Sequence, residues 1–324
     1  MPHSQPFINM IVKRNFHPLR IWAYIKNQVL FVLFWSLAVW LTFFFTKETS
    51  MALNFTPIGI LGSALAIFVA FRNNSAYGRW WEARTLWGGI VNSSRVFARL
   101  VITFTDSHVH QENYQKDRSE AFKKSLVYKQ IAWVHAMRLH LRGQDKWKEL
   151  EPFLEETEYA EIREKDHKPN AIHLLMGKQI YKAMANGTLG GFDSFQMEGQ
   201  LLALTNYQGG AERIKNTPLP RQYDYFTRVF VRLFALLLPF GLLGFFVTGE
   251  LVQLSWLVVP LSVLIAGVFI IMERTGAANE DPFENKITDV ALTSICNTIE
   301  RNLKELLGET DLPKKLETVD GYLY

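Results

Sequence analysis

The sequence lacks most of the features that mark a secreted or enzymatic domain. Its 324 residues include one cysteine, Cys296, so no disulfide can form within the chain, and a reducing cytosol suits its polar part. It has no Gly-rich phosphate loop, no H-E-x-x-H pair and no C-x-x-C pair, the short motifs that carry common phosphate and metal chemistry. An alternating strand pattern is also missing. These absences disfavour an enzyme, and Cys296 is expected to be a small buried hydrophobe on a helix.

The excess of positive over negative charge is small as well. The chain has 35 Lys and Arg against 31 Asp and Glu, a formal net charge of +4, which is too mild for a nucleic-acid-binding surface. His108 and His110 form an H-x-H pair, which fits a solvated turn far better than a metal site. His135 and His140 are five apart, so they do not share one helical face. We therefore expect no resident metal, no cofactor and no nucleic-acid partner.

Long apolar runs are abundant. Charge-free stretches cover Asn27 to Thr46, 20 residues, and Thr49 to Phe71, 23 residues, and Glu250 is the single charge among the 40 residues from Leu233 to Met272. Each stretch is long enough to cross roughly 30 Å of hydrocarbon. A soluble globule and a disordered chain are excluded, and the pattern predicts a polytopic membrane protein with a sizeable polar part.

Four transmembrane spans are predicted, at about 27–46, 55–71, 229–247 and 251–272. The first begins past residue 20 and lacks a small-residue cleavage site, so we expect it to stay as a spanning helix rather than leave as a signal. Pro239 and Pro260 fall inside the last two spans, and each is expected to kink its helix.

The orientation follows from basic residues near the span ends. They are Lys13, Arg14, Arg20, Lys26, Arg72, Arg79, Arg84, Arg213, Lys215, Arg221, Arg228, Arg232 and Arg274. The two short outer turns hold Lys47, Glu48 and Glu250. Both termini and the regions of about 73–222 and 273–324 are therefore predicted to be cytosolic.

The cytosolic part is expected to be a bundle of helices. Between Asp106 and Arg221, 33 residues are charged, yet apolar residues recur at helical spacing. Helix start and stop signals predict helices over about 170–187, 193–206 and 281–308. The fold class predicted from the sequence is all-α, with four membrane helices that continue into this bundle.

The second span carries two stripes of residues four apart. Gly62, Ala66 and Ala70 form a small-residue seam that lets helices approach closely. The next stripe consists of Ser63, Ile67 and Phe71. If several copies of this helix surround an axis, the second stripe forms rings, and rings of Ile and Phe make a dry constriction that gates by dewetting. Ordinary packing or lipid contact is the alternative for the same residues.

Three ordered motifs resemble one known family. Residues 72–88 read RNNSAYGRWWEARTLWG, residues 214–220 read IKNTPLP before an aromatic third span with LLLPFGLLG, and residues 281–309 read DPFENKITDVALTSICNTIERNLKELLGE. Together they resemble the signature of the bestrophin family, in its prokaryotic branch. The resemblance covers about residues 10–309 and makes the chain one bestrophin-like unit over 1–324.

The resemblance implies a homopentamer in the cell inner membrane, with one central pore for small monovalent ions. Ser63, Ile67 and Phe71 match the pore neck, where the family usually has three apolar residues, so Ser63 departs from the pattern. Phe195 and Asp193 match a second constriction, the cytosolic aperture, although Asp193 could equally serve as a helix N-cap.

The resemblance also bears on the permeant ion. Animal members bind calcium through an acidic run after the fourth span, and the matching segment here, 279–284, is short and broken by Pro282, so we predict no calcium site. Prokaryotic members resemble cation channels, sodium included, whereas eukaryotic relatives favour chloride. The resemblance favours cations. A chloride channel of the same family and a membrane-anchored scaffold or sensor without a pore are the alternatives.

Overall fold

The computed structural model describes residues 18–112, 114–247 and 251–317, and every regular element in this part of the chain is helical. The chain divides into two units that share the long helix α2 (Phe55–Ser107). The membrane unit contains described residues 18–80, 218–247 and 251–281. The second unit, called here the helical unit, contains described residues 81–112, 114–217 and 282–317.

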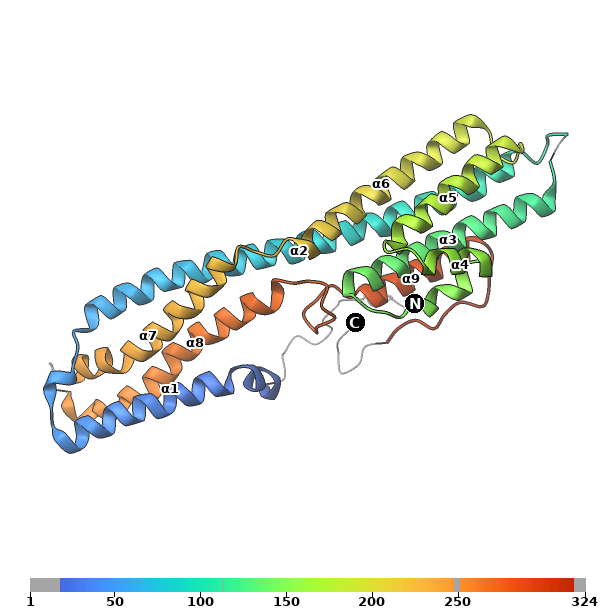
Figure 1. The fold of residues 1–324 in the computed structure, drawn as a ribbon. Coiled ribbons are helices and arrows are strands. Elements are labelled where there is room, and N and C mark those ends of the chain that lie inside the picture. Colours follow the sequence, from blue (N-terminus) through green and yellow to red (C-terminus); the bar gives the residue numbers. More distant parts are fainter. Residues whose placement is uncertain (1–17, 113, 248–250, 318–324) are drawn as a thin grey trace, which may run out of the picture. The chain divides into compact units, whose positions relative to one another are not determined.

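The membrane unit is built from the four apolar helices that the sequence predicts. They are α1 (Pro18–Thr46), the first half of α2, α7 (Arg221–Val247) and α8 (Val258–Asn279), which follows the short 3₁₀ helix η3 (Val252–Leu257). All four are long and apolar enough to cross a membrane. Figure 1 shows α1, α7 and α8 side by side, with α1 packed against α8 and α7. The prediction of four membrane helices is confirmed.

Apolar side chains from all four helices form the core of the membrane unit. Val32 and Val39 of α1, Leu65 of α2, Leu238 of α7 and Ala266 of α8 belong to this core and are all buried. Small residues let the backbones of neighbouring membrane segments approach closely. A Cβ on Gly244, for example, would lie 1.9 Å from the carbonyl oxygen of Leu53, so this position requires glycine.

The two prolines behave differently from each other. Pro239 lies inside α7 and is buried. It has no N–H to donate to the carbonyl of Ala235, four residues earlier. The indole Nε1 of Trp35 donates to the neighbouring Leu236 carbonyl at 3.0 Å, which joins α1 to α7 beside this proline. Pro260 is the third residue of α8, where a missing N–H costs no helical bond. Pro260 thus lies at the start of α8, and the predicted kink there stays a prediction.

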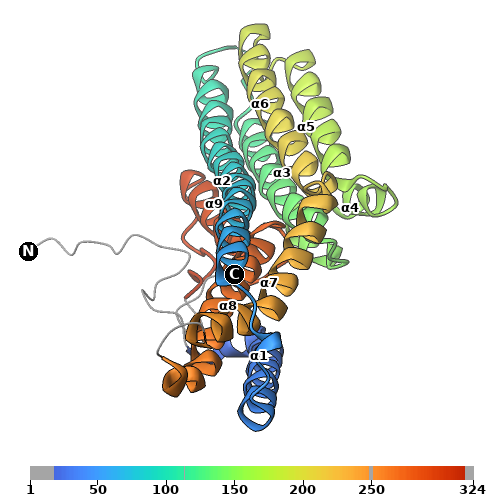
Figure 2. The same ribbon diagram turned by 90° about the vertical axis from the view of Figure 1, so that its left-hand side faces the viewer.

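The helical unit is a bundle around α3. Its helices are α3 (Lys116–Arg142), α4 (Glu156–Arg163), α5 (Lys168–Ala185), α6 (Gly191–Asn216), α9 (Leu292–Leu306), the second half of α2 and the 3₁₀ helix η2 (Trp147–Phe153). Helix α3 packs against α5, α9 and α6, and Figure 2 shows α3, α5 and α6 running alongside one another. Trp133 of α3 is fully buried and stacks on His173 of α5 with ring centroids 4.6 Å apart.

Two helix boundaries in this bundle differ from the sequence-based expectation. Helix α5 is capped by His167, whose side chain accepts from the Asn170 N–H, so Asn170 is not the cap. Helix α6 runs ten residues beyond Asn206, through a Gly-Gly pair whose second glycine lies against Leu86; a Cβ on Gly210 would be 2.8 Å from that side chain. Tertiary contact therefore overrides the poor helix propensity of this pair.

The C-terminal helix begins later than predicted. Residues 281–291 form turns rather than the start of a helix, and the Asp289 carboxylate accepts from the Lys286 N–H at 3.1 Å. Gly308, with φ +79°, ends α9 at the predicted place. Cys296 lies fully buried on α9, and burial raises the pKa of its thiol to about 12, which confirms its assignment as a small buried hydrophobe.

Candidate functional site

The first half of α2 packs one face against the other helices of the membrane unit. Gly62, Leu65 and Val69 are buried there. A Cβ on Gly62 would lie 2.9 Å from the ring of Phe234, so this glycine lets α2 and α7 approach closely. Of the predicted small-residue seam, Gly62 alone lies on this inner face, since Ala66 and Ala70 are exposed.

The opposite face of α2 carries the three residues predicted for the pore neck. Ile67 is 58% exposed and Phe71 is 69% exposed in the single chain, and Ser63 is exposed as well. The Ser63 hydroxyl donates to the Gly59 carbonyl at 3.0 Å, which ties its donor to the helix backbone. The three side chains thus lie on one apolar, unpartnered stripe. Their place around a pore axis is a property of an assembly and stays a prediction.

Directly after Phe71, Arg72 forms a buried ionic cluster. Its guanidinium donates to the carboxylate of Asp224 from α7, to the Glu273 carboxylate at 3.3 Å and to Glu280 at 3.5 Å. It also donates to the Glu273 carbonyl at 3.1 Å. The Arg72 side chain is 3% exposed. One arginine therefore connects α2 to the start of α7 and the end of α8, immediately beside the exposed stripe.

A second arginine holds the segment after α8. Arg79 donates from Nε to the Glu280 carbonyl at 2.9 Å, and its Nη2 lies 3.9 Å from the Asp281 carboxylate. The Glu280 and Asp281 carboxylates of segment 279–284, which follows the fourth span, are thus paired with arginines of α2. A calcium ion would have to displace these pairs to use the same carboxylates.

The start of α6 carries the two residues predicted for the cytosolic aperture. Asp193 is the third residue of the helix, not its N-cap. Its carboxylate accepts from the Gly190 N–H at 2.8 Å and lies 2.7 Å from Nε2 of His108, at the end of α2. The hydrogen bond to Asp193 raises the pKa of His108 above its usual value, and a hydrogen bond to Gln111 makes a smaller contribution in the same direction.

Aromatic rings stand exposed beside this pair. Phe195 is 74% exposed and Phe192 is 69% exposed, and Phe192 lies 6.4 Å from Phe104 of α2 between ring centroids. Phe195 and Asp193 are thus close in the chain but differ in environment, since the Asp193 side chain is 14% exposed. Phe192 joins them as an apolar residue of the same turn that the sequence analysis did not single out.

Sequence reasoning missed the partners of these residues. Arg72 stood out as a basic residue after a span, but its three carboxylates lie about 150 to 210 positions away. His108 does lie in a turn, as predicted, but it is mostly buried against Asp193 and not solvated. Neither pairing leaves a local spacing signal that a single sequence can reveal.

Comparisons with known proteins show which family has this sequence and architecture. The family profile described as Bacterial/Fungal Bestrophin protein matches residues 9–305. The chain belongs to the bestrophin family. This bestrophin is 32% identical over 318 residues to the voltage-dependent anion channel-forming protein YneE of Escherichia coli K12, covering 95% of this chain and 97% of the relative. It is 31% identical to the protein of the same description from Ralstonia nicotianae, RSc3414, covering 80% and 79%.

Solved structures agree with the assignment. A crystal structure of a bacterial bestrophin homologue from Klebsiella pneumoniae superposes with a TM-score of 0.77 at 29% identity, covering 88% of this chain and 99% of that one. A tryptophan-to-alanine variant of the same homologue gives 0.78 at 28% identity, covering 91% and 100%. The predicted family and all-α membrane fold are confirmed. The relatives are described as channel-forming proteins, not as enzymes.

Proposed function

We propose that this bestrophin is a homopentameric ion channel that conducts small monovalent ions passively. The observation that carries the proposal is the exposed stripe of Ser63, Ile67 and Phe71 on α2, opposite a face buried in its own unit. Helices from neighbouring copies would surround one axis with these stripes facing inward. The description of the Escherichia coli relative as channel-forming supports this assignment.

The neck would be a dry constriction. Rings of Ile67 and Phe71 offer no carbonyls to replace a hydration shell, so ions would pass largely hydrated or with weak contacts to aromatic edges and faces. Ser63 would form a wetter outer ring, so the barrier would rest on the other two residues. In this assembly the protein would lie in the inner membrane, with both termini and the regions 73–222 and 273–324 in the cytosol, as the distribution of basic residues favours.

The subunit number can be counted directly. An image of the purified particle along its symmetry axis is expected to show five subunits around a central opening, with Ile67 and Phe71 pointing into it. A particle without an axial opening, or one in which these two side chains face lipid, would contradict the channel and favour a membrane-anchored scaffold.

For the permeant ion we propose cations. Asp193 beside the exposed Phe195 would place one carboxylate per subunit at the cytosolic aperture. Its pair with His108 carries a net negative charge above the raised pKa of His108, where the imidazole is neutral. Favourable Coulomb interaction with cations follows from that charge. The name of the relatives, which are described as anion channel-forming, favours anions instead, and this is the second candidate.

Reversal potentials separate the two candidates. In planar bilayers with asymmetric NaCl, at a pH above the raised pKa of His108, the full-length protein is expected to reverse near the sodium equilibrium potential. Asp193→Asn should move the reversal potential toward zero, because it removes the charge that favours cations. Reversal near the chloride potential would overturn the cation assignment while leaving the channel intact.

A further inference from the structure

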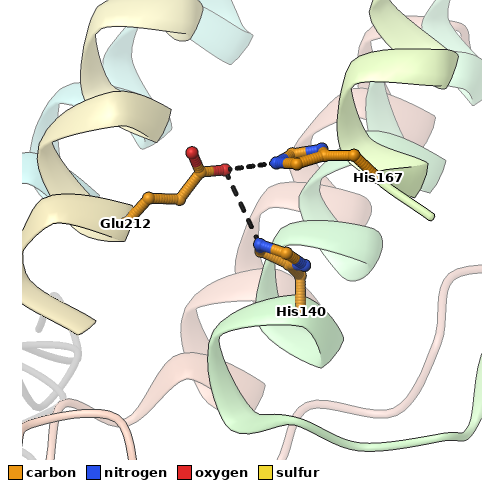
Figure 3. A group of neighbouring side chains, drawn as sticks. All are labelled: His140, His167 and Glu212. Carbon is orange, nitrogen blue, oxygen red and sulfur yellow. Dashed lines mark hydrogen bonds and ion pairs between the residues drawn. The ribbon is translucent and has the colours of Figure 1, made fainter. Parts of the chain in front are cut away.

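Two histidines and a glutamate from three segments meet in the helical unit (Figure 3). His167 Nε2 lies 3.0 Å from Glu212 Oε1, and His140 Nε2 lies 3.8 Å from the same oxygen. Each residue offers one ligand atom, and these three atoms all lie within 4.8 Å of one another. Among the described residues this is the group whose histidines and carboxylate converge in this way.

We propose that His140, His167 and Glu212 form a binding site for a divalent transition-metal ion, with Zn²⁺ as the best fit. Donor atoms in a tetrahedral Zn²⁺ site with bonds of about 2.0–2.1 Å lie about 3.3–3.4 Å apart. The two separations to the Glu212 oxygen, 3.0 and 3.8 Å, bracket that value, and the two histidine nitrogens lie within 4.8 Å of each other, so side-chain rotations would bring the three atoms to that spacing. Two imidazoles with one carboxylate suit zinc, whereas calcium and magnesium prefer sites made of oxygen atoms.

The site is reachable and keeps one position open. The side chains of His140, His167 and Glu212 are 31%, 36% and 22% exposed, so an ion can enter from solvent and retain a water as its fourth ligand. The neighbouring Lys168 does not occupy the site with its ammonium, which donates to the Lys165 carbonyl at 2.8 Å and lies 4.7 Å from the centroid of the Trp147 ring.

Binding would exchange one weak contact for metal ligation. His167 Nδ1 accepts from the Asn170 N–H at 3.3 Å, so in the metal-free protein the proton sits on Nε2 and is donated to Glu212. A neutral His167 that ligates through Nε2 carries its proton on Nδ1 and loses this long cap contact. The ion would then join the last turn of α3, the start of α5 and the last two turns of α6, the helix whose first turn carries Asp193 and Phe195.

Zinc titration of the full-length protein tests the site. The protein should be free of any histidine tag, treated with chelator and titrated with ZnCl₂ in a calorimeter; one ion per chain is expected. Removing even an outer-shell partner of a metal ligand costs about 10–100-fold in affinity, so His167→Ala and Glu212→Gln should each weaken binding by about 100-fold or more. Co²⁺ added to the metal-free protein should give the intense visible absorption of a tetrahedral site.

Two variants keep the experiment decisive. Glu212→Gln retains a carbonyl oxygen that can accept from His167, so its fold is expected to survive and its loss of binding would report ligation. His110→Ala removes an exposed histidine from a turn and should leave both the affinity and the cobalt spectrum unchanged. Absence of saturable Zn²⁺ binding in the unmodified chain, or equal binding in the Glu212→Gln variant, would overturn the proposal.

Discussion

Replacing Arg72 by methionine is expected to lower the free energy of unfolding by about 3–5 kcal/mol, the usual cost of removing one partner from a buried ionic cluster. The Arg72 guanidinium is 3% exposed and is shared by Asp224, Glu273 and Glu280. Without it, three carboxylates would face one another at low dielectric, and the remaining cations beside them would be Arg228 at Asp224 and Arg274 at Glu273. Reversible unfolding of the detergent-solubilised protein measures the loss.

The matched control lies on the same helix. Arg95 is exposed and donates to the Asn302 side chain at 2.6 Å. Arg95→Met deletes the same charge and is expected to cost no more than about 1 kcal/mol, as for exposed polar contacts in general. If both variants unfold at the same point, the Arg72 cluster does not stabilise the membrane unit as its geometry predicts.

Phe71→Ala is expected to raise the single-channel conductance or open probability, with about tenfold more current for every 1.4 kcal/mol removed from the barrier. The reasoning is that an apolar ring that narrows and dewets the neck is the barrier to ions, and alanine widens it. Ile67→Ala should act in the same direction. Recordings from protein reconstituted in planar bilayers measure both.

An exposed phenylalanine on another membrane helix provides the control. Phe34 of α1 is 65% exposed, close to the 69% of Phe71, and it lies outside the proposed neck. Phe34→Ala should leave the current unchanged, because a ring outside the neck does not narrow the pore. Unchanged currents in both the Phe71 and Ile67 variants would remove these residues from the gate.

The membrane helices were predictable because their signal is local. A charge-free run of 20 residues, such as Asn27 to Thr46, must be helical in hydrocarbon, where every backbone group needs a partner within its own segment. The spacing of Ser63, Ile67 and Phe71 likewise fixes a common face, since residues four apart lie on one side of a helix.

Helix ends were less predictable. Helix α6 continues through Gly209 and Gly210 because Leu86 packs closely against Gly210, where a larger residue would not fit. Helix α9 starts at Leu292, since residues 281–291 are held in turns by contacts such as that of Asp289 with the Lys286 N–H. In both places tertiary contacts outweigh propensities of about 1 kcal/mol per residue.

The family was predictable from three motifs that resemble its signature. The all-α class, the four membrane helices and the common face of the neck residues were predictable because each depends on composition or on spacing within one segment. The tertiary structure decided the pairings: Arg72 with three acids, His108 with Asp193, and His140 with His167 and Glu212. The last two of these residues are 45 positions apart. Their atoms meet only because packed helices bring distant segments within hydrogen-bonding distance, and no local pattern encodes such a meeting.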